Sequence, residues 1–377
     1  MTDRIRRFLA DKQPETPCLV VDLDVVEFNY RRMRELLPQA KIFYAMKANP
    51  ANEVLARLGK LGSSFDTASR GEIELCFGQG VPADRISFGN TIKKEKDIAW
   101  AHQNGVRLFA FDSEAELQKL ARSAPGARVF CRVLVDCGGA EWPLSKKFGC
   151  APDMARDLLK RANEMGLEAY GISFHVGSQQ TDLDQWDRAL AQVSQMFYAL
   201  AETGVDLKMV NLGGGFPARY RKDVAPVEAY CEAVQRALVR HFGNHMPEVI
   251  IEPGRSMVGD AGVLQSEVVL ISRKSANDRK RWVYLDVGKF GGLAETMDES
   301  IKYRITTPYP TGGRSGPVVL AGPTCDSADI LYEKTEYKMP LALKVGDKVE
   351  ILSTGAYTTT YASVAFNGFQ PLKTYCI

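Results

Sequence analysis

Short apolar runs alternate with helix-like segments along the first two thirds of the chain. The runs that resemble strands are IFYAM (42–46), SSFD (63–66), RISFGN (85–90), RLFAFD (107–112), RVFCRVLV (128–135), AYGISFHVG (169–177), KMVNLGGG (208–215) and EVIIEPG (248–254). A segment with helical spacing follows nearly every run, as NEVLARLGKLG does at 52–62. Repeated strand–helix units predict parallel strands, and about eight of them predict a (β/α)8 TIM barrel.

Beyond residue 260 the pattern becomes β-rich, with Gly, Pro and charged turns between the runs. These runs are VLQSEVVLISRK (263–274), RWVYLDVGKF (281–290), GPVVLAGPTC (316–325), DKVEILSTGAY (347–357) and ASVAFNGF (362–369). They predict a C-terminal antiparallel β domain. The early run PCLVVD at 17–22 has no paired helix and is expected to cross over to this domain. We therefore expect a barrel at 24–260 and a β-sandwich or β-barrel-like domain built from 1–23 and 261–377.

Composition narrows the possible partners. The chain has 377 residues, 45% of them hydrophobic and 25% charged, with a net charge of only +2, and no basic stripe suits a nucleic acid. An apolar run long enough to cross a membrane is missing, as is a secretion signal. The eight cysteines form no Cys-x-x-Cys pair, so reduced thiols and no metal site are expected. These features predict a cytoplasmic protein without nucleic-acid or membrane partners.

Chemically active residues stand where the predicted barrel strands end, which is where this architecture places its active sites. Lys47 follows IFYAM directly, and burial at the barrel mouth would lower the pKa of its amine and make it a Schiff-base nucleophile. A lysine that extends from the rim into water is the alternative. The glycines at 213–215 offer bare N–H groups for a phosphate at a helix N-terminus, although such runs also occur in simple turns.

The motif EPGR adds groups for the same ligand. Gly254 and Arg255 suit a phosphate, and Glu252 suits the ring nitrogen of a pyridine cofactor. A carboxylate there keeps the ring protonated, so that the ring can accept the electron pair released by decarboxylation. His175 either stacks on a planar ring, carries a proton or is a hydrogen-bonded core residue.

Two turns of the β-rich region carry further candidates. Cys325 and Asp326 follow a Gly-Pro turn, a poor place for a packing cysteine, which suggests a functional thiol. Tyr357 lies in a similar turn, where its hydroxyl could reach a phosphate or its ring could belong to the core.

Taken together, these motifs resemble the fold-type III family, the barrel-type pyridoxal 5'-phosphate (PLP) dependent decarboxylases of basic amino acids, whose barrel is like that of alanine racemase. The segments that carry the resemblance are YAMKANP (44–50), FDTASRGEIE (65–74), SFHVGSQ (173–179), NLGGGFP (211–217), EPGR (252–255), GPTCDSAD (322–329) and GAYTTTYASVAFNGF (355–369). They occur in the family's order over nearly the whole chain.

The resemblance implies a role for each candidate. Lys47 would bind PLP covalently, Glu252 would pair with its ring nitrogen, His175 would stack on the ring, and Cys325 would return a proton to Cα. Residues implied around the cofactor are Asp66, Glu72 and Arg132, and those implied at the phosphate are Ser178, Gly214, Gly215, Gly254, Arg255 and Tyr357.

The resemblance also implies a homodimer with shared active sites, in which Lys147 and Asp329 form an intersubunit ion pair. Asp326 would select a distal ammonium, and a second carboxylate is expected within LAETMDES. Asp298 is the preferred candidate there, with Glu295 and Glu299 open. The expected reaction is decarboxylation of L-ornithine to putrescine in polyamine biosynthesis, with L-lysine to cadaverine also possible.

Other outcomes remain open at this point. The chain could prefer a carboxylated polyamine, arginine or diaminopimelate, or it could be a non-catalytic PLP-binding homologue.

Overall fold

The computed structural model describes residues 1–142, 146–310 and 312–377. The chain forms two compact units, one of residues 27–217 and 224–254, the other of residues 1–26, 218–223 and 255–377. The β-rich unit thus includes 218–223 and 255–260, since the Arg221 N–H donates to the Lys302 carbonyl at 2.9 Å and the Ser353 hydroxyl donates to Asp260 at 2.6 Å.

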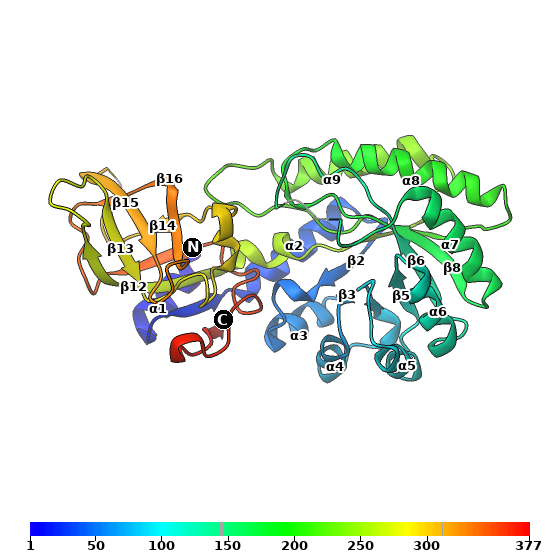
Figure 1. The fold of residues 1–377 in the computed structure, drawn as a ribbon, viewed down its shortest axis with the longest axis horizontal. Coiled ribbons are helices and arrows are strands. Elements are labelled where there is room, and N and C mark those ends of the chain that lie inside the picture. The colour runs from blue at the N-terminus through cyan, green and yellow to red at the C-terminus, as the bar shows by residue number, and fades with distance from the viewer. Residues whose placement is uncertain (143–145, 311) are drawn as a thin grey trace. The chain divides into compact units, whose positions relative to one another are not determined.

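The first unit is a closed barrel of eight parallel strands, which confirms the predicted barrel (Figure 1). Its strands are β2 (Ala40–Ala45), β3 (Ser64–Thr67), β4 (Ile86–Phe88), β5 (Leu108–Phe111), β6 (Arg128–Arg132), β8 (Glu168–Ser173), β10 (Met209–Asn211) and β11 (Glu248–Ile251). Pairing of β11 with β2 closes the ring. All eight correspond to the apolar runs read from the sequence.

Helices alternate with these strands. They are α2 (Leu23–Leu36), α3 (Asn52–Lys60), α4 (Arg70–Gly78), α5 (Glu95–Gln103), α6 (Glu114–Ser123), α7 (Pro152–Glu164), α8 (Gln185–Ala201) and α9 (Val227–Phe242). Helices α4 and α6 begin at Ser-x-x-Glu sequences, where the hydroxyls of Ser69 and Ser113 accept the N–H groups of Glu72 and Glu116. The chain therefore turns from strand to helix directly above the barrel end.

Side chains from six strands fill the inside of the barrel. The buried cluster consists of Phe43, Ala110, Phe130, Tyr170, Met209 and Ile250. This packing makes the barrel a solid core that holds the loops above it.

The second unit is a mixed sheet. Its strands are β1 (Cys18–Val21), β12 (Gly262–Ser272), β13 (Arg281–Leu285), β14 (Ile305–Thr306), β15 (Ser315–Ala321), β16 (Ile330–Pro340), β17 (Lys348–Leu352) and β18 (Lys373–Cys376). Most pairs are antiparallel, as predicted, but β13 pairs with β15 and β1 with β18 in parallel. Residues 362–369 form no strand; they contain the short 3-10 helix η5 (Phe366–Gly368), in which Asn367 and Gly368 have positive φ.

Strand β1 lies between β12 and β18, so the early apolar run is part of the sheet of the β-rich unit. Helix α1 (Asp3–Lys12) covers this part of the sheet through Ile5 and Leu9, which pack on Cys18, Val20 and Val263. Both ends of the chain are therefore built into one sheet.

Two searches of the described residues give negative results. None of their helices is long and apolar enough to span a membrane. No group of three His, Cys, Asp or Glu side chains among them is placed to hold a metal ion. None of the eight cysteines, all of which the structure describes, forms a disulfide bond.

Strand β8 depends on Gly171, which faces Met209 of β10 in the barrel. A Cβ atom at residue 171 would lie 2.2 Å from the Met209 carbonyl oxygen. We expect Gly171→Ala to lower the free energy of unfolding by about 1–3 kcal/mol, as measured by urea denaturation.

The matched control is Gly78→Ala at the end of α4, where an added Cβ meets nothing within 4 Å. This variant should be neutral or slightly more stable, because alanine favours the helix. Equal stability of the two variants would contradict the close packing of β8 on β10.

Candidate functional site

Lys47 lies directly beyond β2, in the 3-10 helix η1 (Met46–Ala48). Met46 and Ala48 are buried, but Lys47 is exposed, so the prediction that the barrel mouth buries this lysine is wrong. The Tyr44 hydroxyl donates to the Asn49 carbonyl at 2.9 Å and fixes the turn. The ammonium keeps its contact with water because the turn leaves it on the accessible side.

Three carboxyl groups act on this lysine. Burial raises the pKa of Asp66, Glu72 and Glu252, and the positive charge of Lys47 opposes that rise in each case. The negative charge of Glu252 raises the pKa of Asp66 further. The barrel end therefore gathers four of the predicted site residues into one electrostatic cluster.

Asp66 and Glu72 are held by their own loops. The Ser87 hydroxyl donates to Asp66 at 3.2 Å, and Gly89 leaves room for this carboxylate, since a Cβ there would lie 1.8 Å from an Asp66 oxygen. Glu72 accepts the Ala68 N–H at 2.6 Å. Neither carboxylate can move far without losing these bonds.

Glu252 follows β11 and is fixed by Asn211 at the end of β10. The Asn211 side chain donates to the Glu252 carboxylate, and its oxygen accepts the Gly213 N–H at 2.9 Å. The Glu252 N–H donates to the Gly213 carbonyl at 2.8 Å. One asparagine thus aligns the carboxylate with the glycine run.

The glycine run forms a cradle that side chains would fill. A Cβ at Gly214 would lie 2.6 Å from the Glu252 carbonyl oxygen, and Gly215 has φ +99°. A Cβ at Gly254 would lie 3.0 Å from that of Ala48. Within the described part of the chain, the N–H groups of Gly214 and Gly215 make no hydrogen bond. Bare N–H groups of this kind suit a phosphate.

The glycines do not stand at a helix N-terminus, which corrects that prediction. Helix α9 begins only at Val227, because the residues between form an irregular loop. Ser178 instead begins the short strand β9 (Ser178–Gln180), and the Gln180 N–H donates to the Gly215 carbonyl at 2.9 Å. Strand β9 pairs with β7 (Ala140–Trp142) in a two-stranded antiparallel sheet that the sequence did not reveal.

Arg132 and His175 line one cavity of about 470 Å³ beside the cluster. The Nδ1 atom of His175 accepts the Gly177 N–H at 3.0 Å. Burial, Arg132 and Lys47 all lower the pKa of His175, well below its ordinary value. The ring is therefore neutral and keeps Nε2 as its donor, which suits stacking better than proton transfer.

Arg255 and Tyr357 belong to the β-rich unit, where they contact each other. The Arg255 guanidinium lies 4.9 Å from the centre of the Tyr357 ring, and Tyr357 has φ +58°. Arg255 also donates to the Tyr220 hydroxyl at 2.7 Å and to both carboxylate oxygens of Glu295. The Arg255–Glu295 pair is buried. Both oxygens of the Glu295 carboxylate are therefore occupied by Arg255.

The other two acidic candidates differ from Glu295. The carboxylate of Glu299 accepts the N–H groups of Glu333, Lys334 and Thr335 at 2.6–2.8 Å, which hold the pKa of Glu299 at about 2 against the effect of burial. Asp298 is exposed and has φ +50°. Of these three carboxylates, Asp298 alone has no hydrogen bond to another described residue.

Cys325 and Asp326 are exposed in the loop after β15. The Cys325 N–H donates to the Asn367 side-chain oxygen at 2.8 Å. Asp329 at the end of this loop is 2% exposed and accepts the Lys289 N–H at 2.8 Å and the Thr324 hydroxyl at 2.7 Å. Its predicted pairing with Lys147 of a partner subunit stays a prediction.

Sequence reasoning missed several residues that hold the site. They are Ser87, Gly89, Asn211, Glu295 in its role as the partner of Arg255, and Asn367. Asn211 and Gly89 do follow apolar runs that were read as strands, so the rule that strand ends carry function could have found them. The partners of Glu295 and Asn367 lie far away in sequence and gave no local signal.

The observed groups fit PLP. The glycine cradle can receive its phosphate, Lys47 offers an accessible amine, and the neutral His175 ring offers a flat face. A protonated ring nitrogen would also relieve the cost of burying the Glu252 carboxylate.

Comparisons with known proteins agree with this fit. The family model described as pyridoxal-dependent decarboxylase, pyridoxal binding domain, matches residues 23–259. A lysine/ornithine decarboxylase of Selenomonas ruminantium is 38% identical over 98% of this chain and 91% of its own length. Mouse ornithine decarboxylase is 32% identical over 95% and 80%. The solved structure of a Vibrio vulnificus lysine/ornithine decarboxylase with cadaverine has a TM-score of 0.89 and 32% identity, covering 100% of this chain and 99% of the other.

The pH dependence of stability tests the environment of His175. Because its pKa is lowered in the folded state, the unfolded chain binds a proton near pH 6.5 that the folded protein does not. Stability should therefore fall as the pH drops below about 6.5, and His175 should contribute up to about 1.4 kcal/mol per pH unit. His175→Gln should remove this contribution, as measured by urea unfolding of the cofactor-free protein.

The raised pKa values of Asp66, Glu72 and Glu252 have the opposite effect on stability. As the pH falls, these carboxyl groups bind protons at a higher pH in the folded protein than in the unfolded chain, which stabilises the folded state. Comparing the variant with the wild type isolates the histidine. His245→Gln at the exposed end of α9 is the control and should leave the slope unchanged. An unchanged slope in His175→Gln would contradict the burial of this ring.

Proposed function

Because the chain belongs to the family of pyridoxal-dependent decarboxylases, we propose that it converts L-ornithine to putrescine and carbon dioxide, and that it also accepts L-lysine. The observation that carries this proposal is the cluster at the barrel end, where the charges of Lys47 and Glu252 act on Asp66 beside a glycine cradle. The lysine/ornithine decarboxylases among the relatives support both substrates.

The barrel supplies the groups that would hold the cofactor. The phosphate would be bound by the N–H groups of Gly214 and Gly215, together with Ser178 and Gly254. Lys47 would bind the aldehyde carbon of the cofactor. Glu252, held by Asn211, would keep the ring nitrogen protonated. When bound, PLP accepts the electron pair that remains after the carboxylate leaves.

The β-rich unit supplies Arg255 and Tyr357 for the phosphate in this proposal. Glu295 takes both terminal nitrogens of Arg255, so Tyr357 is the group of this pair better placed to offer a donor. The Arg255 guanidinium then packs on the face of the Tyr357 ring in a cation–π interaction and holds the ring in place.

Cys325 is proposed to return a proton from its thiol to the substrate Cα, which completes the amine product. In this scheme the Cys325 loop enters the active site of a second copy in a homodimer. Exposed apolar side chains close to it support such an interface, with Val364 82% and Phe369 42% exposed. Exposed groups of this kind favour protein contacts.

Substrate choice is assigned to Asp326 and Asp298. Both carboxylates are exposed, whereas Glu295 and Glu299 are occupied by Arg255 and by backbone N–H groups. Exposed carboxylates suit a distal ammonium, and that of Asp326 also accepts the Ala328 N–H at 2.8 Å. Lysine has one methylene more than ornithine, and a single methylene changes binding by only about 1–3 kcal/mol, which supports a dual preference.

A substrate panel tests the proposed reaction. Carbon dioxide release would be measured from ornithine, lysine, arginine and meso-diaminopimelate with the PLP-loaded protein. We expect ornithine first and lysine second. Lys47→Ala should lose the visible absorbance of the bound cofactor and at least about a thousandfold in activity. Release from neither ornithine nor lysine, or full turnover by Lys47→Ala, would refute the proposal.

Asp298 is tested by its removal. Asp298→Asn loses one charge at the distal amine, so kcat/KM for ornithine should fall about 10- to 100-fold, mainly through KM. Glu336→Gln is the control, because Glu336 forms only an exposed pair with Lys338 and should change little. An unchanged KM in Asp298→Asn would assign the distal amine to another group.

A further inference from the structure

The proposed proton donor is held from outside its own loop. The Cys325 N–H donates to the Asn367 side-chain oxygen at 2.8 Å. Asn367 lies in η5 with φ +52° and ψ +19°, a left-handed conformation that asparagine tolerates better than most residues. This conformation aims a short side chain back at the Cys325 loop.

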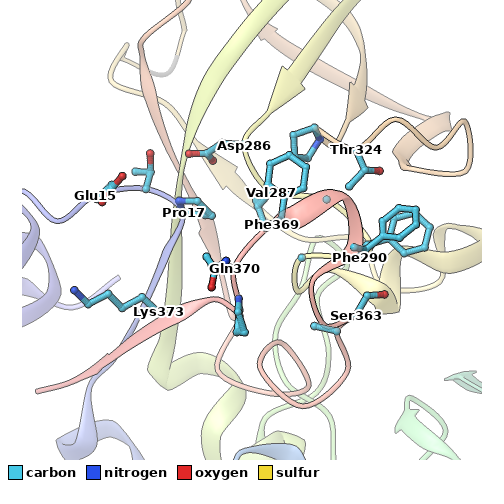
Figure 2. Close-up of a pocket in the computed structure, with 17 residues that line it drawn as sticks. Glu15, Pro17, Asp286, Val287, Phe290, Thr324, Ser363, Phe369, Gln370 and Lys373 are labelled. Atoms are coloured by element: carbon cyan, nitrogen blue, oxygen red, sulfur yellow. The ribbon is translucent and has the colours of Figure 1, made fainter.

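The segment that carries Asn367 is anchored on the loop after β13. The Ser363 N–H donates to the Phe290 carbonyl at 2.9 Å, and the rings of Phe290 and Phe366 lie 4.8 Å apart. Phe290, Ser363 and Thr324 border one cavity of about 280 Å³ (Figure 2). Asn367 thus lies in a segment that is itself attached to the loop after β13.

The base of the Cys325 loop is fixed by a different group. Buried Asp329 accepts the N–H groups of Lys289 and Thr324 at 2.8 and 3.2 Å. Cβ atoms at Gly288 and Gly322 would lie 2.1 and 2.3 Å from this carboxylate, so both segments close tightly around it. The Asp329 carboxylate therefore fixes Thr324, and the Asp329 N–H donates to the Asp326 carbonyl at 3.0 Å, so Cys325 lies between two residues that Asp329 holds.

We propose that Asn367 is a positioning residue for Cys325. A thiol can deliver a proton to Cα only from within hydrogen-bond reach, and a misplacement of about 1 Å can cost about a hundredfold in rate. Asn367 accepts the N–H of Cys325 itself, whereas Asp329 holds the residues on either side of it. This inference rests on the proposed role of Cys325 as proton donor.

Two substitutions separate the hydrogen bond from backbone strain. Asn367→Gly removes the acceptor but allows the left-handed conformation, whereas Asn367→Asp keeps both an acceptor and tolerance of that conformation. The amide hydrogen of Cys325 reports the bond directly. In the PLP-loaded protein we expect it to exchange with deuterium about fivefold faster in Asn367→Gly and near the wild-type rate in Asn367→Asp.

Product balance reports the function. The wild type should form one amine for each carbon dioxide released from ornithine. Asn367→Gly should release more carbon dioxide than it forms amine, while its KM stays close to the wild-type value. A proton that does not reach Cα would be added to the aldehyde carbon of PLP instead, and hydrolysis would then give an aldehyde product and pyridoxamine phosphate in place of the amine. Asn367→Asp should restore the one-to-one ratio. Gln370→Ala is the matched control, since Gln370 donates only to Gly368 in the same segment, and it should retain both readouts.

The outcomes distinguish this inference from the proposed function. Unchanged exchange in Asn367→Gly would show that the bond does not hold the loop. Faster exchange with a one-to-one ratio would show that the bond exists without serving the proton transfer. Either result overturns the positioning role while decarboxylation stands. If the wild type releases no carbon dioxide from any basic amino acid, the proposed function fails and the positioning role fails with it.

Discussion

The structure of this protein depends on the free-energy cost of burying several charged side chains together at one end of the barrel. Burial raises the pKa of Asp66, Glu72 and Glu252 alike, and Lys47 lowers all three. Arg132 adds a second positive charge beside Glu252. Each carboxylate then needs a fixed donor, and Ser87, Ala68 and Asn211 provide them. The loops above the barrel are shaped by these bonds, and the space they leave is suited to an anionic, aromatic cofactor.

Much of this could be predicted from the sequence because its signals are local. Parallel strands buried on both faces form continuous apolar runs, so all eight barrel strands were visible. The residue after each run marks a strand end, and this rule located Lys47, Asp66 and Glu252. The run at 17–22 was expected to lack a paired helix and to join the other unit; helix α2 does follow it, but β1 pairs within the β-rich unit.

Other features depend on partners distant in sequence. The long strand β16 contains charged residues and tyrosines and was not among the runs read as strands, because its pairing with β15 decides its form. The run at 362–369 looked like a strand, but left-handed residues at Ala365 and Asn367 turn it instead. Nothing local distinguishes Glu295 from Asp298, since only tertiary contacts assign one to Arg255 and leave the other exposed. The prediction that Lys47 is buried was wrong for a similar reason.

The place of β1 has a consequence for the order of events during synthesis. The Leu23 N–H donates to the carbonyl of Ile377, and the Ile377 N–H donates to the carbonyl of Val21, so one edge of the first strand is completed by residues more than 350 positions later in the chain. The barrel's own strands are all available once residue 251 has left the ribosome, and domains generally fold as units during synthesis. After β12 has paired with β1, the other edge of β1 stays open until residues 373–376 have been made and can form β18. Proteins that bind exposed strand edges could bind this edge on the nascent chain and would lose it once β18 has paired.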